Sequence, residues 1–257
     1  MSSPTRDWDA TTYEQVAAPQ LEWAREQLQR LSLKGDEVVL DAGCGTGGVT
    51  KLLVDLVPRG RVYAVDAAPS MVARAREVLA GQATVLGQDL LELSLPEQVD
   101  VVFSNATFHW IADHEALFAA LHRALRPGGR LLAQCGGHGN IEAFHRVADS
   151  VAREEPFQSY FEGWRRPWNF ATPEQAAERL RAAGFDQVES WLEPRPVTPE
   201  DPAAFTRTVC LVRHLDPLPE ELRGVFVDRV LARAGQPLVL EYVRLNMTGR
   251  ATRSGRT

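Results

Sequence analysis

The segment Val38-Val39-Leu40-Asp41-Ala42-Gly43-Cys44-Gly45-Thr46-Gly47-Gly48 decides the fold. It reads as an apolar strand, a glycine-rich turn and the start of a helix, an arrangement that lets a small ligand approach the backbone closely. Gly43, Gly45 and Gly48 also have the spacing of the dinucleotide motif GxGxxG, so a protein that binds NAD or FAD has to be weighed.

Short β-branched runs alternate with amphipathic helical patterns on both sides of this segment. The alternation predicts parallel strands joined by crossover helices, and therefore an α/β protein. The predicted strands are 37–41, 61–65, 83–86, 99–104, 130–134, 187–191 and 238–247. Beyond residue 136 the pattern loosens, and it predicts helices around 141–152, 173–183 and 202–234.

Length and composition indicate an ordinary globular protein. The 257 residues are 44% hydrophobic and 24% charged, which suits one α/β domain, alone or with a cap. The 28 basic and 34 acidic residues give a net charge of −6, so no global positive field attracts nucleic acid.

The cysteines and the N-terminal sequence favour a cytoplasmic location. Cys44, Cys135 and Cys210 are widely separated and odd in number, which fits no zinc site or redox dithiol but does fit a reducing cytoplasm. The sequence shows neither a secretion signal nor an apolar run of about 20 residues. We expect a cytoplasmic protein with no membrane partner and no metal.

Three aspartates favour one class of ligand. Asp41 lies where the first strand meets the glycine turn, and there its charge would repel a dinucleotide's pyrophosphate. It would suit S-adenosylmethionine, which has no phosphate and carries an ammonium and a sulfonium. Asp66 ends the second strand and Asp89 follows the third, where they could accept hydrogen bonds from ribose hydroxyls and an adenine amine.

These motifs resemble the class I S-adenosylmethionine-dependent methyltransferases. The resemblance covers the order and spacing of 41–47, Val65-Asp66, Met71, Asp89-Leu90 and 125–129. A closer resemblance is to the trans-aconitate methyltransferase-like branch, and the matching segments are Asp7-Trp8-Asp9, Tyr13 and 104–114. It implies a Rossmann-like, doubly wound, mostly parallel seven-stranded sheet with an antiparallel last strand and a helical cap.

The resemblance also implies roles for particular residues. The turn glycines Gly43, Gly45 and Gly47 would contact the methionine part of the cofactor, and Asp66 its ribose. The other residues that it implies for cofactor binding are Asp41, Ala67, Met71, Asp89, Leu90, Asn105 and Ala106. Tyr13 would bind the cofactor from a lid that also contains Trp8. The plainer alternative is that Asp41 and Asp66 only cap helices or end strands.

The implied organisation is one domain over 1–257. Its parts would be lid helices in 1–36, a cofactor half in 37–136, cap and closing strands in 137–251 and a tail in 252–257. We expect a monomer or homodimer that acts on a small molecule.

The acceptor half offers fewer signals. A carboxylate acceptor, as in the resembled branch, is already ionised and needs no base, whereas a hydroxyl does. Arg165 and Arg166 lie between two tryptophans and could clamp such an anion, while His109 could line the site. His145 is a further polar group in the predicted cap.

The sequence leaves other functions open. Within the class, the methyl group could go to a hydroxyl or a ring carbon. From other classes, an NAD(P)-dependent oxidoreductase and a non-catalytic protein that binds the cofactor stay as alternatives.

Overall fold

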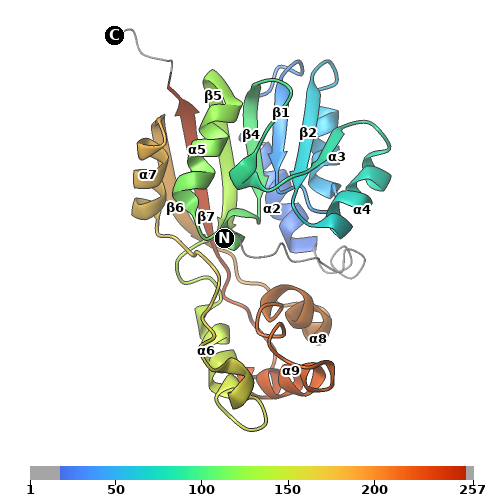
Figure 1. The fold of residues 1–257 in the computed structure, drawn as a ribbon, viewed down its shortest axis with the longest axis vertical. Coiled ribbons are helices and arrows are strands. Elements are labelled where there is room, and N and C mark those ends of the chain that lie inside the picture. Colours follow the sequence, from blue (N-terminus) through green and yellow to red (C-terminus); the bar gives the residue numbers. More distant parts are fainter. Residues whose placement is uncertain (1–17, 253–257) are drawn as a thin grey trace.

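A seven-stranded sheet with helices on both faces forms the upper part of the molecule (Figure 1). The computed structural model describes residues 18–252 of the chain. The strands are β1 (Val38–Ala42), β2 (Arg61–Asp66), β3 (Thr84–Gly87), β4 (Val99–Asn105), β5 (Leu125–Gly136), β6 (Phe185–Pro194) and β7 (Val243–Ala251). Their order is β3-β2-β1-β4-β5-β7-β6, and β7 runs antiparallel to both neighbours. The predicted sheet and its reversed last strand are confirmed.

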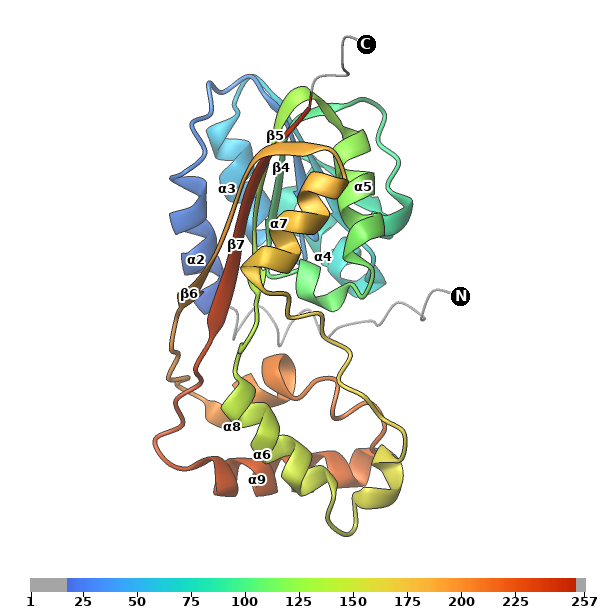
Figure 2. The same ribbon diagram turned by 90° about the vertical axis from the view of Figure 1, so that its left-hand side faces the viewer.

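Side-chain alternation in β1 explains why helices cover both faces of the sheet. Leu40 belongs to a core with α5 (His114–Ala124) and α7 (Pro173–Ala182), whereas Val39 packs with α2 (Ala18–Leu28) and α3 (Gly48–Leu56). Figure 2 shows these two helix pairs on opposite sides of the sheet. A further helix, α4 (Pro69–Leu79), packs on Ala64 of β2.

The cap is a separate helical layer at the lower end in Figures 1 and 2. It consists of α6 (Glu142–Ala152), η3 (Gln158–Phe161), α8 (Pro202–Phe205), the π-helical turn η4 (Thr206–Cys210) and α9 (Glu220–Ala234). These elements share their own core, in which Phe144, Phe157 and Phe226 are buried. One residue of α2, Trp23, belongs to this cap core.

Two boundaries differ from the sequence-based expectation. The helical region predicted at 202–234 is divided, because Pro217 and Pro219 interrupt it before α9 begins. The last strand starts at Val243 rather than Leu238, since the preceding residues pass through the cap, where Leu240 pairs with Val197 as an isolated bridge.

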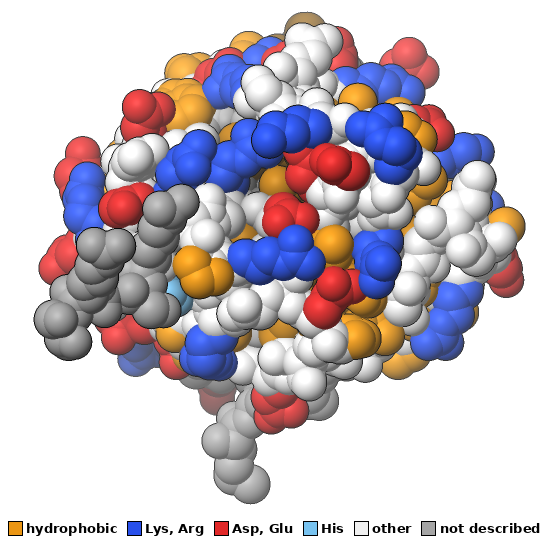
Figure 3. All heavy atoms as spheres, turned by 90° about the horizontal axis from the view of Figure 1, so that it is seen from above, with side chains coloured by type: hydrophobic (Ala, Val, Ile, Leu, Met, Phe, Trp, Pro, Cys, Tyr) orange, Lys and Arg blue, Asp and Glu red, His pale blue; other side chains and the backbone are white. Residues whose placement is uncertain are grey.

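The end of the molecule opposite the cap carries acidic and basic side chains side by side (Figure 3). Here Arg126 bonds Asp100 at 2.8 Å, and Arg61 bonds Glu97 at 2.7 Å. The first pair joins the neighbouring strands β5 and β4, and the second joins the start of β2 to the loop before β4. These ion pairs therefore have a structural role at this edge of the sheet. No helix within residues 18–252 is long and apolar enough to cross a bilayer.

Candidate active site

A cavity of about 1010 Å³ lies where the carboxyl ends of the parallel strands meet the cap. Open α/β sheets bind ligands at this edge, where neighbouring crossovers leave in opposite directions. In this sheet that point lies between β1 and β4, because β2 pairs on one side of β1 and β4 on the other.

The glycine turn after β1 is fixed to both neighbouring strands. The N–H groups of Gly43 and Cys44 donate to the Val65 carbonyl at 2.8 and 3.0 Å. Gly43 has a φ of +86°, and an added Cβ would lie 2.2 Å from the side chain of Thr107. Gly45 differs, because a Cβ there would meet nothing within 4 Å on the cavity side of the turn.

Asp41 lies deep in the cavity wall. Its side chain is 1% exposed, and one carboxylate oxygen accepts a 2.6 Å hydrogen bond from the Thr50 hydroxyl of α3. Burial raises the pKa of this carboxyl to about 7, although the Thr50 bond acts in the other direction. The nearby carboxylate of Asp66 raises it further. The site therefore holds a carboxyl that a cation would convert fully to its charged form.

Asp66 and Asp89 also line the cavity, and both make backbone bonds as well. The two oxygens of Asp66 accept from the N–H groups of Gly45 and Ala68, each at 2.9 Å, and burial raises its pKa. Asp89 accepts from the Leu91 N–H at 2.9 Å. Each carboxylate has about four lone-pair positions, so these capping bonds leave capacity for a ligand.

The end of β4 and the helix α2 each bring one unsatisfied acceptor to the cavity. The Asn105 side chain donates to the Gln20 carbonyl of α2 at 2.9 Å, which leaves its own amide oxygen buried without a hydrogen bond. The amide oxygen of Gln20 is also buried and unbonded. Ala106 has a left-handed φ of +59°, a strained conformation of the kind found at binding sites.

The remaining residues implied for the cofactor divide into three groups. Ala67, Met71 and Leu90 line the cavity. Gly47 is not part of its wall; its φ is +87°, and an added Cβ would lie 3.2 Å from Leu79 of α4. Tyr13, with Trp8, lies outside the described residues.

Histidines and aromatic rings form the wall between sheet and cap. The ring of His109 stacks on Phe170 with centroids 5.7 Å apart, and its Nδ1 accepts from the Gly136 N–H at 3.3 Å. His145 of α6 stacks on Trp168 at 4.5 Å. Burial lowers the pKa of His109 well below its usual value and that of His145 to about 3, so both rings are neutral at pH 7.

The arginines that line the cavity are not the predicted pair, Arg165 and Arg166. Arg165 is exposed, and Arg166 bonds Asp149 at 2.5 Å and Glu142 at 2.6 Å within the cap. Neither arginine lines the cavity. Arg213 of the cap and Arg244 of β7 do, and burial lowers the pKa of Arg213.

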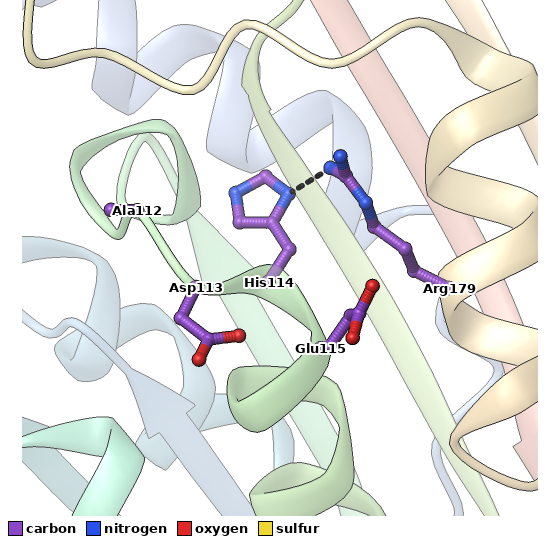
Figure 4. A pocket seen from close by; sticks show the side chains of 5 residues that line it. All are labelled: Ala112, Asp113, His114, Glu115 and Arg179. Atoms are coloured by element: carbon purple, nitrogen blue, oxygen red, sulfur yellow. Dashed lines mark hydrogen bonds between the residues drawn. The ribbon is translucent and has the colours of Figure 1, made fainter.

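A second, smaller cavity of about 330 Å³ lies between α5 and α7 (Figure 4). His114 and Arg179 point toward one another across it, with 3.3 Å between Nδ1 and the guanidinium. The other ring nitrogen of His114 lies 2.9 Å from the Phe108 carbonyl. Because both nitrogens are engaged, this histidine holds two helices together. Asp113 lines both cavities and caps α5 by accepting from the Ala116 N–H.

Comparisons with known proteins agree with this geometry. A family model described as a methyltransferase domain matches residues 40–133. A trans-aconitate 2-methyltransferase from Methylobacterium nodulans is 31% identical over 96% of this chain and 99% of its own length. The chain belongs to the class I S-adenosylmethionine-dependent methyltransferases. It is an enzyme that uses S-adenosylmethionine as methyl donor.

Two other similar proteins place the methyltransferase among its relatives. A malonyl-[acyl-carrier protein] O-methyltransferase from Anoxybacillus flavithermus is 34% identical over 70% of this chain and 69% of its own. The solved structure of Haemonchus contortus phosphoethanolamine N-methyltransferase 2, in complex with phosphomonomethylethanolamine and S-adenosylhomocysteine, has a TM-score of 0.61. It is 20% identical, over 95% of this chain and 57% of that one, and it shows the shared fold.

The cavity wall of this methyltransferase fits its cofactor. The unbonded oxygens of Asn105 and Gln20 are acceptors that an ammonium group would satisfy. The buried Asp41 carboxyl has a raised pKa that a cation would lower. Gly45 keeps the turn open where a side chain would enter the cavity.

The sequence reasoning did not identify Gln20, Arg213, Tyr242 or Arg244 as wall residues. Arg244 had a signal, because it is a charged residue inside the predicted last strand, 238–247. The others had none, since their place depends on how the cap and α2 fold over the sheet edge.

Proposed function

We propose that the enzyme transfers a methyl group to a carboxylate of a small organic acid. The observation that carries the proposal is the charge distribution around one cavity. Three aspartates lie in one half of the sheet edge: Asp41 near the end of β1, Asp66 at the end of β2 and Asp89 just after β3. Arg244 lies on β7 in the other half, and Arg213 lies on the cap.

This distribution matches a cationic donor and an anionic acceptor that meet in one cavity. Guanidinium groups bind carboxylates through paired, charge-assisted hydrogen bonds. The named activities of two relatives, one acting on trans-aconitate and the other a malonyl O-methyltransferase, lend support, because both names denote acids or their derivatives.

We propose that the cofactor half uses the residues of the acidic wall. Asp66 accepts from the ribose and Asp89 from the adenine amine, while Asn105 and Gln20 face the methionine ammonium. The turn glycines and Asp41, with Ala67, Met71, Leu90 and Ala106, complete the surface; Tyr13 is proposed as part of a lid, and Gly47 supports the turn from behind.

The chemistry asks little of the protein besides alignment. S-adenosylmethionine supplies an electrophilic methyl group on a good leaving group. The residues have to orient the acceptor carboxylate in line and exclude water, which the stacked aromatic wall of His109, Trp168 and Phe170 favours.

A hydroxyl acceptor would need a general base, and the cavity histidines are poorly suited to that role. His145, with a pKa near 3, binds a proton weakly at neutral pH, and the pKa of His109 is also well below its usual value. The pKa values of these rings therefore favour an acceptor that is already ionised.

A paired acceptor panel tests the proposal. Each carboxylic acid is offered beside its primary amide and a phenol of similar size, and methylated product and S-adenosylhomocysteine are measured by mass spectrometry from pH 6 to 9. We expect product from acids and none from amides. With S-adenosylmethionine saturating at every pH, we expect a rate nearly independent of pH, since the acid stays ionised throughout. Methylation of phenols alone, at a rate that rises with pH, would reject a carboxylate acceptor.

A further inference from the structure

Arg244 is a buried cation that reaches the cavity from the sheet. It is 2% exposed, and it lies at the start of β7, opposite Gly136 of β5. Its guanidinium carbon lies 4.7 Å from the centre of the Trp23 ring of α2. In such a low-dielectric position a guanidinium attracts an anion far more strongly than it does in water.

A chain of buried amides continues from Arg244 across three neighbouring strands. The Arg244 Nε donates to Gln134 of β5 at 3.3 Å, and the Gln134 amide donates to Asn246 of β7 at 2.8 Å. The Asn246 amide then donates to Glu193 of β6 at 3.3 Å. Gln134 is 2% exposed and Asn246 is fully buried.

The charged ends set the direction of this chain. A guanidinium has no acceptor, so the oxygen of Gln134 must face Arg244 and its amide nitrogen must face Asn246. A carboxylate has no donor, so the nitrogen of Asn246 must face Glu193. Both ends thus require the same orientation of both amides, which holds the Arg244 side chain in one direction.

The far end of the chain connects to the helix that covers the cavity. Glu193 pairs with Arg195 at 2.7 Å, and Arg195 also pairs with Glu26 of α2. The same helix supplies Trp23 beneath Arg244, and Gln20 and Leu21 to the cavity wall. The direction of the guanidinium and the position of α2 therefore depend on one continuous set of contacts.

We propose that Arg244 binds the carboxylate of the acceptor, and that Gln134 and Asn246 are positioning residues that fix the direction of its guanidinium. The proposal rests on the proposed function. Arg213 is a weaker choice for this role, because it lies on the cap and its side chain is about a quarter exposed. Arg244 is set in the sheet, beside Gly136, whose N–H bonds His109.

Binding to the complex with S-adenosylhomocysteine tests Arg244 without any turnover. By calorimetry, the wild-type complex is expected to bind trans-aconitate at least 10-fold more tightly than the neutral trimethyl ester of that acid. Arg244→Gln is expected to weaken the binding of the acid by at least 10-fold and to leave the affinities for the ester and for S-adenosylhomocysteine unchanged. Arg250→Gln is the matched control, because Arg250 is an exposed arginine at the other end of β7.

A second variant covers a folding failure of Arg244→Gln. Arg244→Lys keeps the positive charge but loses the planar guanidinium with its paired donors, and we expect it to weaken the binding of the acid 3- to 10-fold. The positioning role is tested with Gln134→Met, for which we expect a 3- to 10-fold loss for the acid and none for S-adenosylhomocysteine. Gln27→Met, at a buried glutamine of α2 outside the cavity, should change neither affinity.

The outcomes separate the two proposals. The first outcome is that the wild type prefers the acid to the ester, and Arg244→Gln binds the acid as tightly as the wild type does. Arg244 then does not bind the carboxylate, although the proposed function stands. If Arg244→Gln does not fold, Arg244→Lys decides in its place. If Gln134→Met weakens the acid and S-adenosylhomocysteine alike, the amide has only a structural role. If the wild-type complex binds acid and ester equally and methylates no acid, both proposals fail.

Discussion

Replacing Asp41 with asparagine is expected to stabilise the cofactor-free enzyme while it weakens cofactor binding. Asparagine has nearly the same shape and keeps an oxygen that can accept from the Thr50 hydroxyl. It removes only the ionisable group, so the variant isolates the effect of a carboxylate held 1% exposed in the cavity wall.

The magnitude follows from the pKa of Asp41, which burial raises from 3.8 to about 7. Because the folded-state pKa lies above the unfolded one, the folded protein keeps the proton through this window. The wild-type free energy of unfolding therefore falls as the pH rises from about 4 to about 7. A shift of about three units corresponds to about 4 kcal/mol, and Asp41→Asn lacks this loss.

Urea unfolding at pH 5, 6, 7 and 8 measures the difference in unfolding free energy between variant and wild type. We expect that difference to increase by about 2–3 kcal/mol between pH 5 and pH 8, because part of the loss is already present at pH 5, and to level off above pH 7. Asp55→Asn is the matched control, because Asp55 is an exposed residue on α3, and its difference from the wild type should stay flat.

Calorimetry measures the other half of the prediction. When the wild type binds S-adenosylmethionine at pH 7, the cation should convert Asp41 to its charged form and release a proton. The apparent binding enthalpy should then depend on the ionisation enthalpy of the buffer. Asp41→Asn should release less proton and bind at least 10-fold more weakly. A pH-independent stability difference, or unchanged cofactor affinity, would refute the reasoning.

Three more predictions concern the turn, the ribose site and the cap. Asp66→Ala should weaken the binding of S-adenosylhomocysteine by about 2–3 kcal/mol in calorimetry, because the ribose hydroxyls that we propose Asp66 binds would lose their acceptor; an unchanged dissociation constant would remove Asp66 from the site. Gly43→Ala should destabilise the protein by about 2 kcal/mol or more in urea, since its Cβ would overlap a neighbouring side chain, whereas Gly48→Ala has open space and should be neutral or slightly stabilising; equal effects would contradict the close approach. Arg166→Ala should lower the free energy of unfolding by about 1–2 kcal/mol because two carboxylates lose their partner, and replacement of the exposed Arg165 by alanine should not. A selective loss of acid binding in either variant would show that this segment does bind the acceptor anion.

The acidic side of the cavity wall was predictable because its signals are local. Asp41, Asp66 and Asp89 each lie at or just after the end of a strand that the sequence identifies, and parallel strands bring their carboxyl ends to one edge. Gly47 shows the limit of a motif, since the sequence does not tell which glycine faces a ligand and which faces a helix. Here Gly47 packs on α4.

The opposite side of the cavity, where we propose that the acceptor binds, was less predictable because its residues meet only through the tertiary fold. Arg166 looked like an anion clamp beside its tryptophans, but carboxylates of α6 take up its guanidinium. Arg244 is 110 residues from Gln134 in sequence, and their contact depends on the antiparallel pairing of β5 with β7. Local patterns carry no information about such pairings.

The separate cores of sheet and cap have a practical consequence for engineering. The acidic wall rests on the packing of β1 to β4, and many acceptor-side residues belong to a layer whose aromatic core is its own. Cap segments from a related enzyme could thus be grafted to change the acceptor while the donor site is kept. The graft would have to retain Trp23, because this side chain of α2 is shared with the cap core, and Arg244 beside it.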